Sequence, residues 1–142
     1  MSKLLNRFSE LGTFYNLSFS SQVLFSNSII GLDGISRKLL VLIQRTQTSF
    51  EDYVINLDEV KGCTVKKYYD NIKPGDLTNK KPETYLQQIA LRFEFINETE
   101  ALEVIYQLPQ SSKNDRWQII EHKAEQWKQM LTKMLKAPAK VL

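Results

Sequence analysis

Basic and aromatic side chains gather in one segment of the sequence, and these residue types suit the binding of a charged partner. Lysine ammonium groups attract phosphates, and tyrosine rings stack on other flat groups or lie at a membrane interface. We predict this segment as the candidate binding site and call it the Lys/Tyr patch. The alternative is a solvated strand edge, on which lysines prevent pairing with another chain. Its members are Lys61, Lys66, Lys67, Tyr68, Tyr69 and Lys73.

Side chains that could carry catalysis are few. The one histidine, His122, lies off the apolar stripe of a predicted helix, so we expect it to face solvent. The one cysteine, Cys63, lies in an alternating apolar run and is expected to be a small buried hydrophobe. A zinc site needs further His or Cys ligands, and no phosphate-binding loop or nucleophile motif occurs. The sequence therefore predicts a protein that is not an enzyme and uses no metal or cofactor.

Acidic residues are frequent near the predicted turns. Carboxylates commonly form turns by accepting hydrogen bonds from nearby backbone groups, and we interpret these residues in that way rather than as catalytic pairs. They are Asp33, Glu51, Asp52, Asp58, Glu59 and Asp70.

Length and charge narrow the class of protein. The chain has 142 residues, 42% of them hydrophobic and 25% charged, which is typical of one globular domain spanning 1–142. A net charge of +3 is too small to require a nucleic-acid partner. The basic excess lies in residues 113–142, which hold seven basic and three acidic side chains. A single cysteine and the lack of a long apolar run lead us to expect a cytoplasmic protein, membrane-peripheral if the Lys/Tyr patch contacts lipid.

A short amphipathic helix is predicted at residues 1–12. Ser2 offers an N-cap oxygen, and Gly12 is expected to end the helix. The ten residues Ser2–Leu11 make a marginal helix alone, so the apolar stripe must dock on another surface. That stripe consists of Leu4, Leu5, Phe8 and Leu11.

Apolar alternation then predicts an antiparallel sheet over residues 13–108. The first turn falls at Ser20–Gln22 or at Ser26–Ser28, and Asp33-Gly34 indicates a tight turn in which Gly supplies a positive φ. The run 39–43 is apolar on both faces, which is typical of a central or a highly curved strand. The seven predicted strands are 14–20, 22–32, 37–44, 53–57, 61–69, 89–95 and 102–108.

A long amphipathic helix is predicted at residues 115–136. Asp115 is a suitable N-cap, and Pro138 is expected to stop the helix. Apolar residues recur at steps of three and four, so one face must cover a large apolar surface. That face carries Trp117, Ile120, Ala124, Trp127, Leu131 and Met134.

Together these elements predict a mainly β (α+β) fold. A seven-stranded antiparallel sheet, bent into a partly open barrel and capped by the C-terminal amphipathic helix, buries the most apolar surface. This order of elements, with tryptophans on the inner face of the helix, resembles the pleckstrin-homology-like (PH-like) superfold. The family's phosphoinositide-binding members usually carry a basic cluster in the first hairpin, and the first turns here are uncharged. Specific phosphoinositide binding is therefore not predicted.

We expect a non-catalytic binding or scaffolding module, whose partner is a protein or peptide held by strand addition at an open sheet edge or beside the C-terminal helix. One alternative is attachment to an anionic membrane through the Lys/Tyr patch, together with the stripe of the N-terminal helix. The other is a small-ligand carrier with a cavity inside the barrel. Its polar groups would come from Tyr53, Tyr68, Tyr69 and Tyr106.

Overall fold

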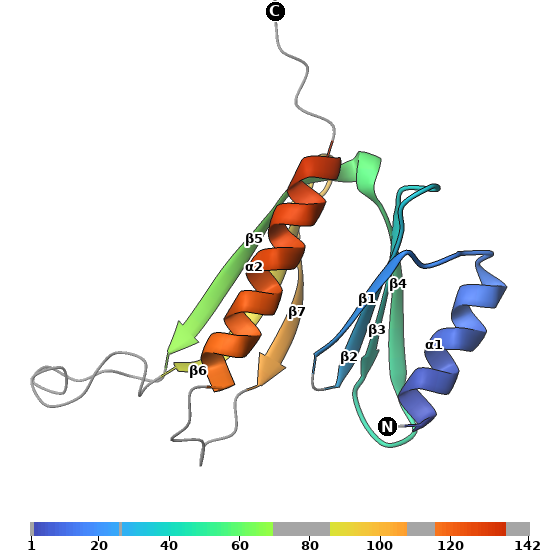
Figure 1. Ribbon diagram of the computed structural model, residues 1–142, viewed down its shortest axis with the longest axis horizontal. Coiled ribbons are helices and arrows are strands. Elements are labelled where there is room, and N and C mark those ends of the chain that lie inside the picture. The colour runs from blue at the N-terminus through green and yellow to red at the C-terminus, as the bar shows by residue number, and fades with distance from the viewer. Residues whose placement is uncertain (1, 26, 70–85, 108–115, 136–142) are drawn as a thin grey trace, which may run out of the picture.

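The structure is a computed structural model that describes residues 2–25, 27–69, 86–107 and 116–135 (Figure 1). Lys73, Asp70, Asp115 and Pro138 lie outside the described residues. The elements in chain order are α1 (Ser2–Phe14), β1 (Ser21–Phe25), β2 (Ser28–Asp33), β3 (Lys38–Gln44), β4 (Phe50–Asn56), the 3₁₀ turn η1 (Leu57–Glu59), β5 (Val60–Tyr69), β6 (Leu86–Phe95), β7 (Leu102–Gln107) and α2 (Arg116–Met134).

The strands form two sheets. A four-stranded sheet has the order β1-β2-β3-β4, and a three-stranded sheet has the order β5-β6-β7. Every pairing in both sheets is antiparallel, so the predicted antiparallel, mainly β fold with a C-terminal helix is confirmed. The prediction of one continuous sheet is not met in the described strands, because β4 and β5 pair within different sheets.

The four-stranded sheet is covered on both faces. One face packs against α1, and the other shares a core with the three-stranded sheet and α2, as the order of layers in Figure 1 shows. In β3, Leu40 and Leu42 point toward α1, while Leu39, Val41 and Ile43 point into the larger core. This arrangement confirms the prediction of a central strand that is apolar on both faces.

Helix α1 ends later than the sequence predicts. It continues through Gly12 to Phe14 and closes at Asn16, which has a φ of 58°. The Leu17 N–H donates to the Gly12 carbonyl (2.8 Å) and the Asn16 N–H to the Thr13 carbonyl (3.1 Å), the pattern of a Schellman cap. Asn tolerates the left-handed conformation because its short polar side chain interacts locally. The predicted helix end at Gly12 is therefore wrong.

Two further local predictions need correction. No strand forms at 14–20, because the helix and its cap occupy residues 14–17 and a loop follows, and β1 begins at Ser21. The predicted strand 22–32 is instead two strands, with the first turn between Phe25 and Ser28 rather than at Ser20–Gln22. These two errors cancel, so the described residues contain seven strands, the number that the sequence predicts.

The turn after β2 forms where predicted but for a different reason. Asp33 is buried, and its carboxylate accepts hydrogen bonds from the backbone N–H groups of Ser18, Ile35 and Ser36. These bonds, led by the one from Ser18, hold the pKa of Asp33 below its usual range. The positive φ of this turn belongs to Arg37, at 59°, and not to Gly34.

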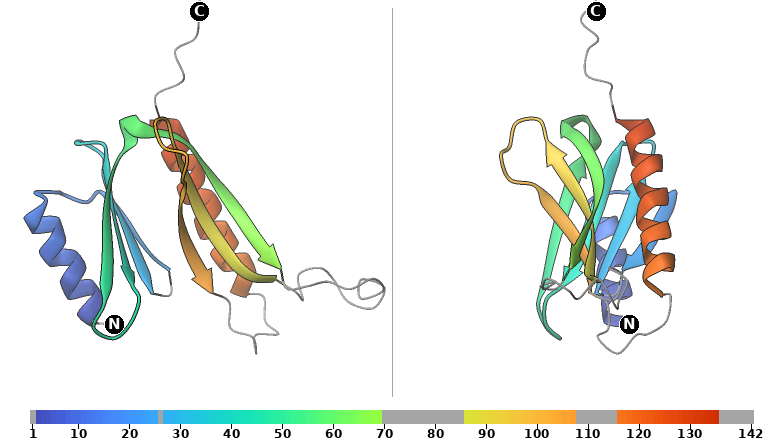
Figure 2. Two further views of the ribbon diagram at one scale, coloured as in Figure 1. Left: turned by 180° about the vertical axis from the view of Figure 1, so that it is seen from behind. Right: turned by 90° about the vertical axis from the view of Figure 1, so that its left-hand side faces the viewer.

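Helix α2 runs from Arg116 to Met134 and presents its predicted stripe to the core. Ile120, Ala124, Trp127 and Leu131 are buried, which confirms the predicted capping face. Figure 2 shows α2 on the opposite side of the three-stranded sheet from the β6–β7 turn.

Close packing of α1 on the four-stranded sheet depends on a glycine. A Cβ added at Gly31 would lie 2.5 Å from the Phe8 ring and 2.7 Å from the Phe19 ring, and these two rings stack with centroids 4.7 Å apart. Gly31→Ala should therefore lower the free energy of unfolding by about 1–3 kcal/mol, measured by urea denaturation.

Gly62→Ala is the matched control, because an added Cβ there meets no atom within 4 Å. It should change stability by no more than about 0.5 kcal/mol. Equal effects of the two substitutions would contradict the proposed packing.

Candidate functional site

The turn η1 moves the chain from one sheet to the other. Leu57 and Val60 are buried and anchor its two ends in the core. The Leu57 N–H donates to the Arg37 carbonyl (2.9 Å), and the Asn56 side chain accepts from the Asp58 N–H (3.0 Å). β5 therefore continues into the three-stranded sheet and does not pair with β4.

Arg37 joins this turn to the end of α2. Its Nε donates to the Asp58 carboxylate (3.0 Å), and its Nη2 donates to the Met134 carbonyl (2.6 Å). A cation at the C-terminus of a helix is favourable, because the last carbonyl groups carry partial negative charge. One side chain thus connects the β2–β3 turn, η1 and α2.

The outer edge of β4 is consequently open. Two hydrogen bonds flank the β3–β4 ladder, from the Leu57 N–H to the Arg37 carbonyl and from the Arg45 N–H to the Ser49 carbonyl. Hydrogen-bonded and non-hydrogen-bonded pairs alternate along an antiparallel ladder, so these two bonds fix which residues of β4 bond to β3. Glu51, Tyr53 and Ile55 then exchange hydrogen bonds with β3, while the backbone groups of Asp52, Val54 and Asn56 point away from it. Within the described part of the chain, no strand pairs with this side of β4.

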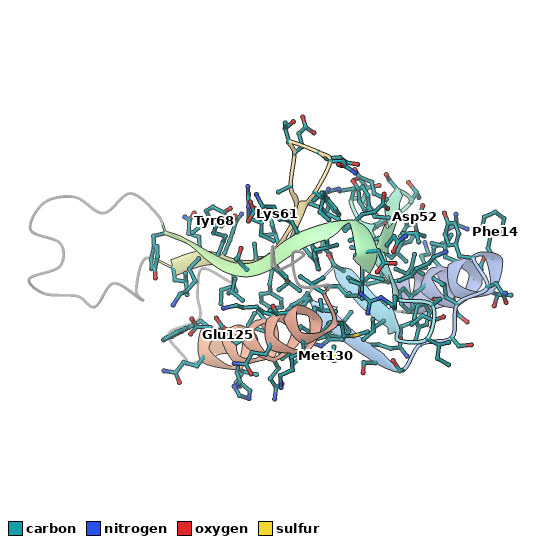
Figure 3. The ribbon with its side chains drawn as sticks, turned by 90° about the horizontal axis from the view of Figure 1, so that it is seen from above. Phe14, Asp52, Lys61, Tyr68, Glu125 and Met130 are labelled. Atoms are coloured by element: carbon teal, nitrogen blue, oxygen red, sulfur yellow. The ribbon has the colours of Figure 1, made fainter. Side chains whose placement is uncertain are left out.

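A groove of about 550 Å³ lies along this edge, which we call the β4 groove. Its volume is within the usual range for ligand sites. It lies on the side of the molecule away from α2, as the position of Asp52 in Figure 3 shows. Its lining residues come from β4, η1, the end of β6, the β6–β7 turn and the start of β7: Asp52–Asn56, Glu59, Phe95, Asn97, Glu98 and Glu100–Leu102.

The β4 groove is acidic. Asp52, Glu59, Glu98 and Glu100 line it, and the described part of its lining contains no lysine, arginine or histidine. The Tyr15 hydroxyl donates to the Asp52 carboxylate (2.7 Å), and this bond raises the pKa of Tyr15 above its usual value. Among the described residues, no three acidic, His or Cys side chains are grouped so that they could hold a metal ion. The four carboxylates therefore spread negative charge along the groove rather than converging on one point.

The Lys/Tyr patch does not form one surface. Its five described members divide between the two faces of β5, because neighbouring residues of a strand point in opposite directions. Lys67 pairs with Glu121 of α2 (2.6 Å), and this bond raises the pKa of Lys67. Tyr69 and Lys66 are exposed, as is Lys61, which lies where the β5–β6 register shifts.

Tyr68 belongs to a polar network on the outer face of the three-stranded sheet. Its hydroxyl donates to the Glu103 carboxylate (2.7 Å), which also accepts from Arg92 at 2.7 Å. These side chains extend across the cross-strand row of residues that contains Ala90. Ala90 points away from the core, yet it is 0% exposed. The patch residue Tyr68 thus has a structural partner.

Two single residues lie as predicted. His122 is exposed, and Cys63 is buried in the core. Burial raises the pKa of the Cys63 thiol to about 12, so the thiol stays protonated and unreactive at neutral pH.

The four tyrosines suggested for a ligand cavity do not converge. Tyr53 donates to Glu51 (2.7 Å) beside the β4 groove, and Tyr106 contacts the Phe25 ring edge-to-face in the core. Tyr68 and Tyr69 are exposed on β5.

Sequence reasoning missed the β4 groove. The sequence favours turn roles for Asp52 and Glu59, and the predicted strands 89–95 and 102–108 imply a turn between them. That turn does form between β6 and β7. The sequence signal for the groove was a set of acidic residues around strand ends, but nothing in the spacing shows that these ends meet.

Comparisons with protein-family models, with curated proteins and with solved structures found no match. In the described residues, no helix is both long and apolar enough to cross a membrane.

The polar network makes a prediction for the pKa of Tyr68. The hydrogen bond to Glu103 raises this pKa, because it favours the protonated phenol. Glu103→Gln should bring the pKa of Tyr68 back toward its usual value of 10.0, measured by NMR titration of the ring carbon that bears the hydroxyl.

Because this pKa is higher in the folded protein, the bond stabilises the fold at neutral pH and is lost as the pH rises through the raised pKa. Glu10→Gln on α1 is the control and should leave the titration of Tyr68 unchanged. An unaltered titration in the Glu103→Gln variant would show that the network does not form.

Proposed function

We propose that this chain is a non-catalytic, PH-like binding module that holds an extended segment of a partner protein along the open edge of β4. The observation that carries the proposal is the row of outward backbone groups at Asp52, Val54 and Asn56 beside the β4 groove. Unpaired N–H and C=O groups at a sheet edge are a template for an added strand. The two antiparallel sheets and the capping helix support the PH-like interpretation.

The lining of the groove supports the same mode of binding. Strand addition gains affinity from main-chain bonds and specificity from contacts with alternate side chains. Val54 and Tyr53 are more than one-third exposed on β4, and Phe95 and Leu102 offer partly buried apolar surface across the groove. An added strand would therefore find backbone partners on one side and apolar contacts on the other.

Membrane attachment receives less support from the contacts. Lys67 and Tyr68 already have partners within the protein, which reduces the charge and surface that the Lys/Tyr patch offers a bilayer. In the stripe of α1, Leu4, Phe8 and Leu11 are buried on the four-stranded sheet, which leaves only Leu5 of that stripe exposed.

Val54→Pro tests strand addition directly. Proline removes the outward N–H of Val54 without removing a bond to β3, and edge strands accept proline at such positions. Peptides selected against the wild-type chain from a displayed 12-residue library should bind the Val54→Pro variant at least about tenfold more weakly, measured by isothermal titration.

Val54→Ala is the matched control, because it removes the same side chain but keeps the N–H group. It should retain most of the affinity, and circular dichroism should show both variants folded. Selected peptides that bind Val54→Pro as well as wild type, or a library that yields no binder, would refute the proposed function.

A further inference from the structure

We infer that the segment held along β4 is basic, with lysine or arginine side chains on an extended strand. This inference rests on the proposed function, since the open edge and the groove form the site and the charge selects the occupant. Complementary potentials favour one partner and exclude others even where each ion pair contributes little.

Among the residues that the structure describes, the lining carries four acidic residues and no cation. Asp52 lies on β4 itself, Glu59 lies in η1, and Glu98 and Glu100 lie in the β6–β7 turn. Glu98 and Glu100 border the groove across from β4, whereas the Asp52 carboxylate lies on the α1 side of β4, where it accepts from the Tyr15 hydroxyl. An added strand would therefore lie beside these acidic residues. A neutral or acidic segment would leave this charge without compensation, whereas a basic segment would pair with it.

The same charge argues against a second copy of this chain as the occupant. Two β4 strands paired edge to edge would bring two copies of Asp52, Glu59 and the acidic β6–β7 turn to one interface. Like charges placed opposite each other on paired strands are destabilising. The partner is thus a different protein segment, and its own charge must be positive.

Three synthetic peptides of equal length serve as probes: (Lys-Thr)5, (Gln-Thr)5 and (Glu-Thr)5, each with blocked ends. Isothermal titration against the full chain should rank them in that order. Several exposed ion pairs together should make (Lys-Thr)5 bind about tenfold tighter than (Gln-Thr)5 at low salt, and 0.5 M salt should reduce this preference.

A triple variant, Glu59→Gln, Glu98→Gln and Glu100→Gln, should lose the preference for (Lys-Thr)5. The control carries the same change of charge outside the groove, at Glu10, Glu121 and Glu125. It should keep the preference, which separates the groove from the overall charge of the protein.

Each other outcome has a defined meaning. Equal binding of (Lys-Thr)5 and (Gln-Thr)5, with both weakened by Val54→Pro, would overturn the basic partner and leave strand addition standing. A preference for (Lys-Thr)5 that survives Val54→Pro would overturn the inference, because the basic peptide would then bind away from the β4 edge. Self-association that Val54→Pro abolishes would overturn it by making the occupant a second copy. Failure of all three probes and of the displayed library would remove the proposed function itself.

Discussion

The hydrogen-bonded turn at Leu57–Glu59 is the feature on which the rest of the structure depends. The turn directs β5 out of the plane of β4, with Leu57 and Val60 buried at its ends. Arg37 holds it through its backbone carbonyl and its guanidinium, and the same guanidinium fixes the last turn of α2. The turn both encloses the core between two sheets and leaves the edge of β4 without a neighbouring strand.

Burial restricts where this protein can meet a partner. The inner β3 strand is buried on both faces, by α1 on one side and by the main core on the other. A four-stranded sheet covered in this way offers partners its edges rather than its faces. The β4 edge differs from a plain edge because the β6–β7 turn lies across from it and forms a groove whose lining is acidic. The open edge of β4 and the acidic lining therefore lie on the same surface.

Much of the fold could be predicted from the residues. The alternation in 89–95 and 102–108 predicted the β6–β7 hairpin, and the stripe from Ile120 to Leu131 predicted the buried face of α2. These patterns succeed because one face of each element is buried and the other is not. The segment 14–20 failed because Leu17 and Phe19 alternate as in a strand, yet they pack from a loop that follows the cap at Asn16.

The site was less predictable than the fold. Asp52, Glu59, Glu98 and Glu100 come together only because the turn at Leu57–Glu59 separates the sheets, and local sequence does not encode which strands then pair. The Lys/Tyr patch shows the converse: its residues are neighbours in sequence, but a strand sends alternate side chains to opposite faces. Whether these lysines contact a membrane stays a prediction.

Amide hydrogen exchange along β4, measured residue by residue by NMR, tests the open edge most directly. In the free protein the amides of Asp52 and Val54 should exchange quickly, while those of Tyr53 and Ile55 exchange slowly because they donate to β3. Adding a bound peptide should slow Asp52 and Val54 and leave the other two unchanged. Slow exchange at Asp52 and Val54 in the free protein, or no change on binding, would contradict an edge that is free to accept a strand.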